Sequence, residues 1–287
     1  MPELPEVESV RRGLVAAQLS TPVHSLWRSP EKLRIGKHWA EENLGCLQGA
    51  MPGAVGRRGK YILWSFTGVD GVALGLVIHL GMSGRCGVAS AGQARVLHTH
   101  LALGFADGRE LRLVDPRRFG GLRAGAMTEL LETPPISELG PEPLEPGFSG
   151  VVLEQALGSS ARPIRDALLD QSAVAGLGNI YAVEALFLAG IHPQLEARRL
   201  HRTAWDRLAG AVVTVLTQGI ENGGTTLKDF RNVVGEVGRN QDDLKVYGRA
   251  GAPCPRCGAA LVGFVSGGRS GVFCPKDQPR PRTRLLR

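Results

Sequence analysis

The chain has 287 residues, of which 43% are hydrophobic and 21% are charged. This composition is typical of a globular protein with a hydrophobic core, and the length predicts more than one domain. The longest apolar run, Val72 to Ile78, is far shorter than the roughly 20 residues of a membrane span, and no signal peptide is evident. We therefore expect a cytoplasmic protein in which Cys46 and Cys86 are buried apolar side chains.

The net charge of +7 is concentrated near the C-terminus. Residues 238–287 contain ten lysines and arginines but only three aspartates, so this segment alone accounts for the whole excess. A basic segment of this kind predicts a nucleic-acid partner, although a basic surface also serves solubility alone.

The first residues are Met1, Pro2 and Glu3. If Met1 is removed, Pro2 presents a free secondary amine, and because α-amines have a pKa of about 7.7–8.0, a fraction is nucleophilic at neutral pH. Attack on a carbonyl-type carbon gives a Schiff base, and Glu3 can transfer the protons that this reaction requires. Taken alone, such a start is more often an ordinary terminal segment, so the hypothesis needs support from the rest of the chain.

The N-terminal part predicts a β-sandwich preceded by one helix. Apolar side chains recur with helical spacing over residues 7–15, and Glu3 and Glu6 lie near the expected helix start, where negative charge is favourable. Short apolar runs at 61–66 and 72–80 predict strands, and a turn at Asp107-Gly108 predicts a hairpin between 101–105 and 111–114. We assign residues 1–130 to this domain.

A proline-rich stretch from Thr133 to Leu144 predicts a linker, placed at 131–150. After it the pattern becomes helical, and we assign residues 151–235 to a helical domain. The expected helices span 163–169, 179–189 and 204–220. The glycine-rich turn before Asn179 presents backbone amides that suit a phosphate, or it simply caps the helix.

The last segment, 236–287, carries the spacing of a zinc ribbon. Cys254 and Cys257 form a Cys-x-x-Cys pair, and Cys274 follows after 16 residues with Asp277 in the fourth position. Four cysteines at this spacing would be a strong zinc signal, and a carboxylate oxygen is an accepted zinc ligand. A ribbon that has lost its ion and is held by packing alone remains the alternative.

Eight sequence blocks in this order resemble those of the bacterial formamidopyrimidine-DNA glycosylases, which repair 8-oxoguanine. The resemblance covers the chain except for its last few residues, and it rests on residues 1–8, 57–61, 79–84, 115–120, 140–144, 176–182, 223–230 and 246–249. It implies a multidomain α+β fold: an N-terminal β-sandwich with a leading helix, a helix–two-turn–helix domain and a C-terminal β-hairpin zinc ribbon.

The resemblance also implies roles for four catalytic residues. Pro2 is the nucleophile that attacks the sugar C1′, and Glu3 is the general acid/base that opens the ribose. Lys60 serves β-elimination on the 3′ side, with simple phosphate binding as its alternative. Arg269 serves the second, δ-elimination step.

Further residues of the family contact DNA. Because a glycosylase extracts its target base, side chains must fill the gap, and the resemblance assigns this task to Met82, Arg117 and Phe119. Without the resemblance, Met82 and Phe119 would be assigned to the core. Ser160 stands where the family has a lysine, so Arg162 or Arg165 is the candidate substitute, and His100 is either a DNA contact or a surface residue. The remaining implied DNA contacts are His98, Asn179 and Lys228.

Two departures from the family pattern matter. Asp277 replaces the fourth zinc cysteine, so one structural zinc ion is the expected cofactor with an altered ligand set. Arg239 and Asn240 stand after Gly238, where the family commonly has two aromatic residues in a loop that covers the extracted base. This change predicts weaker stacking and more polar contact with the base.

The function that follows is base-excision repair. We expect a glycosylase and abasic-site lyase that removes 8-oxoguanine and formamidopyrimidines through a Schiff base at Pro2, followed by β- and δ-elimination. An endonuclease VIII-like enzyme for oxidised pyrimidines is the near alternative, which Leu4 argues against. A catalytically silent protein that binds damaged DNA is the other. The expected partner is damaged double-stranded DNA, bound by a monomer with no membrane association.

Overall fold

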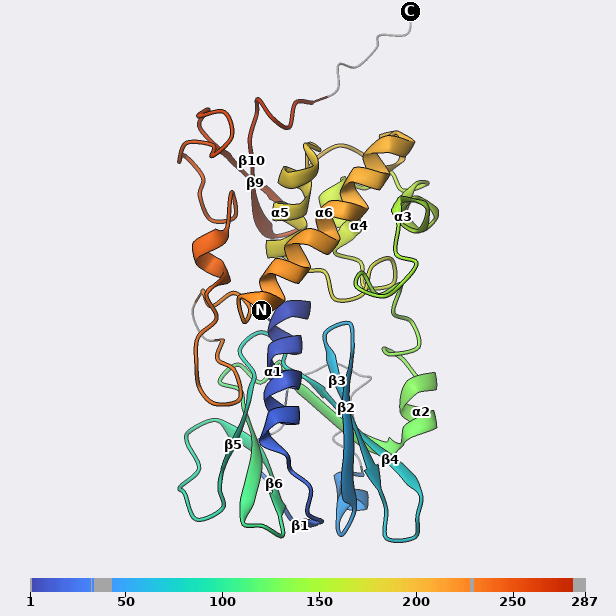
Figure 1. The fold of residues 1–287 in the computed structure, drawn as a ribbon, viewed down its shortest axis with the longest axis vertical. Coiled ribbons are helices and arrows are strands. Elements are labelled where there is room, and N and C mark those ends of the chain that lie inside the picture. The colour runs from blue at the N-terminus through green and yellow to red at the C-terminus, as the bar shows by residue number, and fades with distance from the viewer. Residues whose placement is uncertain (1, 32, 34–42, 228–229, 281–287) are drawn as a thin grey trace, which may run out of the picture. The chain divides into compact units, whose positions relative to one another are not determined.

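The structure, a computed structural model, describes residues 2–31, 33, 43–227 and 230–280. Within them the chain forms two compact units. Unit 1 comprises Met1–Glu138 and Gly219–Gln241, and unit 2 comprises Leu139–Gln218 and Asp242–Arg287. The domain limits expected from the sequence stay a prediction. In the structure, residues 219–241 pack with the N-terminal part of the chain as part of unit 1 (Figure 1).

Unit 1 begins with helix α1, Leu4–Ala17, where the sequence predicts it. Pro5 stands in the first turn, where its missing N–H is not needed, and Gln18 ends the helix in the left-handed conformation at φ 48°. The side chains of Val7 and Leu14 on the predicted apolar face are almost fully buried, whereas Val15 at the end of that face is 50% exposed.

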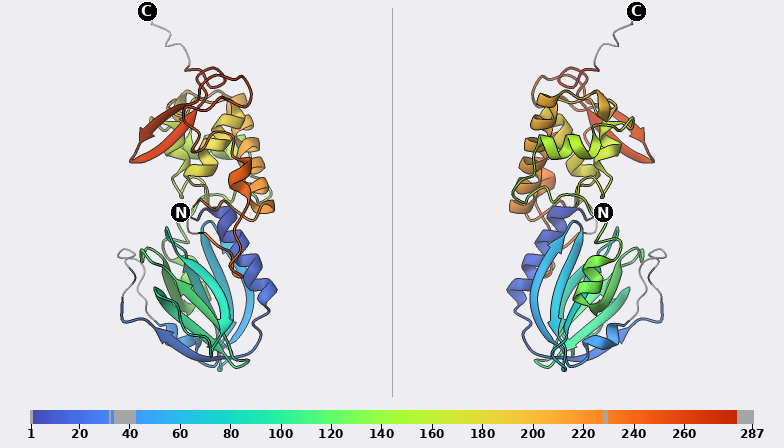
Figure 2. Two further views of the ribbon diagram at one scale, coloured as in Figure 1. Left: turned by 90° about the vertical axis from the view of Figure 1, so that its left-hand side faces the viewer. Right: turned by 90° about the vertical axis from the view of Figure 1, so that its right-hand side faces the viewer.

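Two antiparallel four-stranded sheets form the sandwich, so this prediction is confirmed (Figure 2). The predicted hairpin is present, with Leu103 opposite Leu111. One sheet has the order β1 (Val23–Arg28), β6 (Thr99–Phe105), β7 (Arg109–Val114), β5 (Arg85–Ser90). The other has the order β2 (Met51–Arg58), β3 (Tyr61–Thr67), β4 (Ala73–His79), β8 (Gly121–Ala126).

The core of unit 1 lies between the sheets and extends to α1. Trp64 stacks on Phe105 with ring centroids 5.9 Å apart. Cys86 is buried as predicted, and burial raises the pKa of its thiol to about 12. The prediction for Cys46 was wrong: it is exposed, because the short 3-10 helix Leu44–Leu47 turns its two leucines inward.

Unit 2 contains the helices that the sequence predicts. Helix α5 begins at Asn179 after the cap residue Gly178 and ends before Gly190, which adopts φ 68°. The predicted helix at 163–169 is shorter, and the one at 204–220 begins earlier. The helices are α3 (Gly150–Leu157), α4 (Ile164–Leu168), α5 (Asn179–Ala189) and α6 (Arg202–Glu221), while α2 (Met127–Glu132) belongs to unit 1.

The C-terminal hairpin pairs β9, Val262–Ser266, with β10, Arg269–Phe273. Gly267 and Gly268 form its turn, and both have a positive φ that glycine adopts without strain. The hairpin packs on a small core that includes Phe187 of α5.

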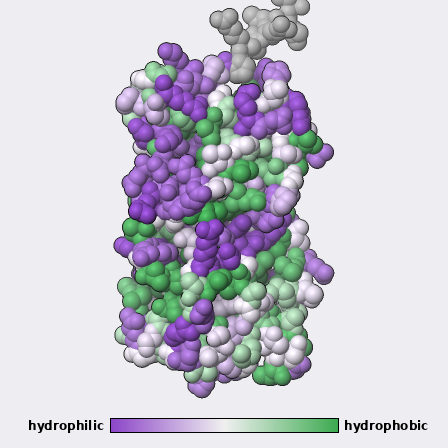
Figure 3. Space-filling model, viewed as in Figure 1, coloured by the Kyte–Doolittle hydropathy of each residue, from purple (hydrophilic) through white to green (hydrophobic). Residues whose placement is uncertain are grey.

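Among the described residues, no helix is both long and apolar enough to cross a bilayer. Hydrophilic and hydrophobic side chains are interspersed on the face shown in Figure 3.

Candidate active site

The N-terminus of α1 is enclosed by protein. Pro2 is buried, and Glu3 is only 2% exposed. The backbone N–H of Glu3 donates to Glu6 Oε2 at 2.7 Å, and the other oxygen of Glu6 accepts from the backbone N–H of Thr225 at 2.6 Å. The Glu6 carboxylate therefore fixes the backbone beside Pro2 to the segment 219–241 of the same unit.

Lys60 lies on the turn between β2 and β3 and is 7% exposed. The guanidinium of Arg57 connects this turn to α1: it donates to the carbonyl of Gly59 at 2.9 Å and to Glu8 at 3.4 Å. Burial alone would raise the pKa of Glu8, but hydrogen bonds from the neighbouring arginines and the charge of Arg57 keep that pKa below its usual range. Glu8 is thus an anionic anchor that joins α1 to the strand that leads into Lys60.

A neutral imidazole lies near Lys60. Burial, and then the positive charge of Lys60, lower the pKa of His79 to about 4, although Asp115 acts in the opposite direction. The ring of His79 lies 4.8 Å from that of Tyr61, the residue after Lys60. The surroundings of the lysine therefore add no second positive charge from His79 at neutral pH.

Arg117 and Phe119 stand on a turn organised by the buried carboxylate of Asp115. Its oxygens accept from Ser83 Oγ at 2.5 Å and from the backbone N–H groups of Arg117 at 3.2 Å and Gly120 at 2.6 Å. Several donors on one carboxylate hold the turn in a single shape.

The loop with Met82 packs directly against this turn. Gly81 has φ 61°, and a Cβ added there would lie 2.2 Å from the carbonyl carbon of Phe119, so only glycine fits. Met82 is 39% exposed, and the guanidinium of Arg117 lies 5.1 Å from the ring centroid of Phe119. The structure thus brings the two loops with the predicted gap-filling residues together, and it does not place Met82 in the core.

His98 lines an open pocket of about 360 Å³ together with Arg117 and Phe119. His98 is exposed and has φ 65°, a conformation in which its carbonyl accepts from the N–H of Asp115 at 2.9 Å. Glu31 also lines this pocket and lies 3.3 Å from Arg118.

One of the two roles that the sequence left open for His100 is wrong, and the other, a DNA contact, stays a prediction. His100 is 5% exposed, so it is not a surface residue, and its Nε2 lies 3.0 Å from the carbonyl oxygen of Asp115. The side chain therefore packs against the backbone of the Asp115 turn.

In unit 2, a hydrogen bond to the residue after Arg269 brings the predicted residue Asn179 close to the predicted residue Arg269. The side chain of Asn179 donates to the carbonyl of Ser270 at 2.8 Å, which joins the start of α5 to β10. Arg269 is exposed at the first position of β10. Arg165 is fully buried and donates to the carbonyls of Ser266 and Arg269, so it stabilises the hairpin. Because its side chain has no exposed surface, it does not replace the family's lysine.

Arg162 remains on the surface, with 53% of its side chain exposed. Its guanidinium donates to Asp170 at 3.0 Å and to the carbonyl of Asp166 at 2.7 Å. Its role in DNA binding stays a prediction.

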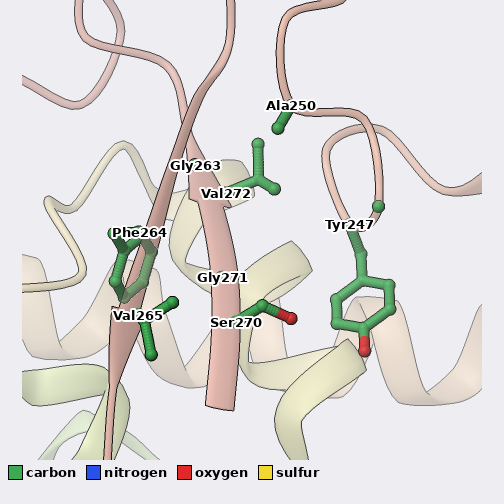
Figure 4. A pocket seen from close by; sticks show the side chains of 9 residues that line it. Tyr247, Ala250, Gly263, Phe264, Val265, Ser270, Gly271 and Val272 are labelled. Atoms are coloured by element: carbon green, nitrogen blue, oxygen red, sulfur yellow. The ribbon is translucent and has the colours of Figure 1, made fainter. Parts of the chain in front are cut away.

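The structure adds two residues of unit 2 to the candidate site, and the sequence alone assigned no role to either. Tyr247 and Ser270 line an open pocket of about 610 Å³ beside the hairpin, with the side chain of Ser270 on the side of β10 that faces Tyr247 (Figure 4). Glu184 of α5 positions Tyr247, because its carboxylate accepts backbone N–H groups from Lys245, Val246 and Tyr247. The signal in the sequence that could have identified Tyr247 is the family block at 246–249, which contains it.

The four predicted metal ligands converge. The ligand atoms of Cys254, Cys257, Cys274 and Asp277 all lie within 4.8 Å of one another. Cys254 Sγ lies 3.1 Å from Asp277 Oδ2, and Cys257 Sγ lies 3.4 Å from Cys274 Sγ. An ion with bonds of about 2.0–2.3 Å requires ligand atoms roughly 3–4 Å apart. These two pairs have that separation, and the donor types are those that zinc accepts, so the residues suit one zinc ion.

The remaining predicted positions lie in segment 219–241. Lys228 lies outside the described residues. Arg239 is exposed, whereas Asn240 is only 4% exposed and hydrogen-bonded inside the protein, so the expectation of more polar contact with the base is not supported for its side chain.

Comparison with known families accounts for nearly the whole chain. The family model described as the formamidopyrimidine-DNA glycosylase N-terminal domain matches residues 1–122, and the formamidopyrimidine-DNA glycosylase H2TH domain matches 139–231. A zinc finger found in FPG and IleRS matches 251–280. The cysteine cluster is therefore a zinc finger that binds one structural ion.

Similar proteins cover the chain from end to end. The formamidopyrimidine-DNA glycosylase of Shouchella clausii is 40% identical over 281 residues, which are 98% of this chain and 100% of the relative. The one from Stenotrophomonas maltophilia is 42% identical, with 97% and 100% covered.

Solved structures agree with the sequence relatives. The crystal structure of the MutM (Fpg) protein of Thermus thermophilus has a TM-score of 0.84 and 39% identity, and it covers 96% of this chain and 98% of that one. A complex between Lactococcus lactis Fpg and DNA containing an abasic site has a TM-score of 0.87 and 33% identity, with 97% and 100% covered. The chain belongs to the formamidopyrimidine-DNA glycosylase family.

Proposed function

We propose that this protein excises oxidised purines from double-stranded DNA and then cleaves the resulting abasic site, with Pro2 as the nucleophile. The observation that carries the proposal is the enclosed start of α1, where Pro2 and Glu3 are buried and Glu6 ties the Glu3 backbone to Thr225. A structural terminus would not need this fixation, whereas a nucleophile gains rate from it.

The first steps release the base. After removal of Met1, the Pro2 nitrogen forms a bond to C1′ of the sugar while the bond from C1′ to the base breaks, and the base leaves with that electron pair. The Glu3 carboxylate takes the N–H proton of the now cationic nitrogen and donates it to the ring oxygen O4′. The C1′–O4′ bond then breaks, so the ribose opens and an iminium joins the proline nitrogen to C1′. A secondary amine keeps this iminium charged without a proton.

The next steps break the strand. The iminium acidifies C2′, which loses a proton to water. The bond from C3′ to its phosphate oxygen then breaks, and the 3′ phosphate leaves with the electron pair while Lys60 acts as the proton donor on the 3′ side. Burial of Lys60 beside a neutral His79 supports a role closer to the reacting atoms than that of a surface phosphate contact. A second elimination releases the 5′ phosphate with Arg269 assisting.

The residues that hold DNA follow from the same geometry. Met82, Arg117 and Phe119 fill the space of the extracted base from two loops joined through Asp115 and Ser83. His98, Asn179 and Arg162 contact the backbone of damaged DNA. We place the activity in the bacterial cytoplasm, at the nucleoid, because its substrate is chromosomal DNA.

Borohydride trapping tests the proposal. The protein is incubated with duplexes that carry 8-oxoguanine, thymine glycol or an abasic site, and mass spectrometry maps the reduced adduct. We expect an adduct at Pro2 with the 8-oxoguanine duplex, and faster trapping there than with thymine glycol. The reverse order of rates supports the endonuclease VIII-like alternative, and no adduct even at the abasic site leaves only a DNA-binding protein.

Two variants and one control sharpen the test. An uncleaved extension ahead of Pro2 should abolish the adduct, because the proline nitrogen becomes an amide. Glu3→Gln should slow base release by about 10²–10⁴-fold, the usual contribution of a positioned acid. The surface variant Glu138→Gln removes a carboxylate far from Pro2 in sequence and should trap at the wild-type rate.

A further inference from the structure

The segment 219–241 of unit 1 closes on itself through small residues. Gly238 packs against Gly224 so closely that an added Cβ would lie 2.0 Å from the Gly224 carbonyl oxygen. The N–H of Gly238 donates to Thr226 Oγ1 at 2.9 Å, and that of Arg239 donates to the carbonyl of Asn222 at 2.9 Å. The two ends of the segment therefore form one compact clamp.

Asn240 places a buried amide in this clamp. Its Nδ2 donates to Thr225 Oγ1 at 2.9 Å, and its Oδ1 accepts from Asn222 at 3.2 Å. Its backbone N–H donates to the carbonyl of Gly224. Both ends of the side chain are satisfied, as a buried amide requires, so the residue is held in one orientation.

The hydrogen bonds continue from Thr225 to the nucleophile. The N–H of Thr225 donates to Glu6 Oε1, and Glu6 Oε2 accepts from the N–H of Glu3, the residue bonded to Pro2. Asn240, Thr225, Glu6 and Glu3 are each no more than 4% exposed. Within this buried path each bond is stronger than in water.

We propose that Asn240 is a positioning residue for the Pro2 nucleophile, acting through Thr225 and Glu6. Where the family commonly has an aromatic residue, this chain uses an amide that reaches inward. Asn240 does not touch the reacting atoms; it orients the carboxylate that orients the backbone beside Pro2. The inference rests on the proposed function of Pro2.

The expected effect appears in the chemical step. Small misplacement of a reacting group costs up to about 10²-fold in rate. We expect Asn240→Ala to slow single-turnover trapping at the 8-oxoguanine duplex by about 10- to 100-fold, with little change in the dissociation constant for DNA.

Thr225 offers an independent pair of variants. Thr225→Val keeps the backbone N–H to Glu6 and removes the hydroxyl that Asn240 holds, so it should slow trapping as Asn240→Ala does. Thr225→Ser restores the hydroxyl and should restore most of the rate. The double variant Asn240→Ala/Thr225→Val should be no slower than either single one, because both break the same path.

Asn232→Ala is the matched control. Asn232 lies in the same segment and accepts backbone hydrogen bonds from Val234 and Glu236, so within the described part of the chain its hydrogen bonds stay local to residues 232–236. It should trap within about twofold of the wild type, which bounds the effect of loosening the segment in general.

Distinct outcomes separate the two proposals. If the wild type forms no adduct, the proposed function fails. If the wild type forms one and both Asn240→Ala and Thr225→Val trap at its rate, only the role of Asn240 is overturned. The same holds if they are slowed no more than Asn232→Ala. Should Asn240→Ala fail to fold, the Thr225→Val and Thr225→Ser pair decides alone.

Discussion

The start of α1 and the C-terminal hairpin each present a predicted catalytic residue from a short segment, but they are stabilised differently. At α1, buried carboxylates such as Glu6 collect backbone N–H groups above the large sandwich core. At the hairpin, a small core is supplemented by a cluster of metal ligands. A segment can rely on hydrogen bonds where a large core supports it, and it needs a metal where the core is small.

The largest effect should follow from loss of the metal. Structural zinc contributes an apparent binding free energy of about 10–16 kcal/mol to small zinc domains, so Cys274→Ala should unfold the hairpin. Limited proteolysis should then cut within 251–280, while thermal unfolding of the sandwich stays cooperative. Protection of the hairpin in the metal-free variant would contradict the contrast between the two regions.

Asp277→Ala tests the altered ligand separately. Three thiolates remain, so we expect weaker but measurable zinc binding, followed by metal analysis during titration with a chelator. Equal zinc content and equal resistance to the chelator in both proteins would show that Asp277 is not a required ligand.

In unit 1, Asp115→Asn should cost roughly 3 kcal/mol or more, because a charged acceptor of several buried hydrogen bonds becomes a partial donor. The free energy of unfolding in urea measures this loss. DNA affinity should fall with it, since the turn carries Arg117 and Phe119. Ser83→Ala removes one donor to the same carboxylate and should cost about 1 kcal/mol, which serves as the graded comparison.

The partly buried His79 predicts a pH dependence of unit 1. Its pKa is lowered from 6.5 to about 4 in the folded state, so the unfolded chain binds a proton first as pH falls. The stabilisation is complete above pH 6.5 and is lost progressively between pH 6.5 and 4, by up to about 3 kcal/mol. Unfolding free energies at several pH values should show this slope, and His79→Gln should flatten it, whereas the exposed His201→Gln should not.

The smallest effect concerns Arg162. Its ion pair with Asp170 is exposed, and such pairs contribute about 0–1 kcal/mol to stability, so Arg162→Ala should leave unfolding almost unchanged. If Arg162 contacts a phosphate, the slope of log affinity against log salt should fall by about 1. An unchanged slope would remove Arg162 from the DNA contacts, with Arg117→Ala as the comparison on unit 1.

Local patterns were sufficient to predict several elements. The helical spacing at 7–15, the Asp107-Gly108 turn and the glycine limits of α5 each act within a few residues, and the structure confirms all three. The metal ligands could be predicted equally well, because their spacing is a local property of the chain.

Residues whose role depends on distant contacts were harder to predict. Cys46 is exposed because Leu44 and Leu47 face the core, and His100 is buried with its Nε2 against the carbonyl oxygen of Asp115, 15 residues away. The sequence suggests Arg165 as a phosphate ligand. In the structure its guanidinium instead donates hydrogen bonds to carbonyl groups of β9 and β10, which lie 101 and 104 residues away in the sequence.

The sequence by itself determined the family, the sandwich with its leading helix, three of the helices of unit 2 and the zinc ligands, because periodicity, turn residues and motif spacing are local. Only the tertiary structure decided that Glu6 joins Glu3 to Thr225, and that Asn240 turns inward to hold Thr225. The bond from Thr225 to Glu6 joins residues 219 positions apart. Hydrogen bonds at such separation depend on how the core places whole segments, which no local pattern encodes.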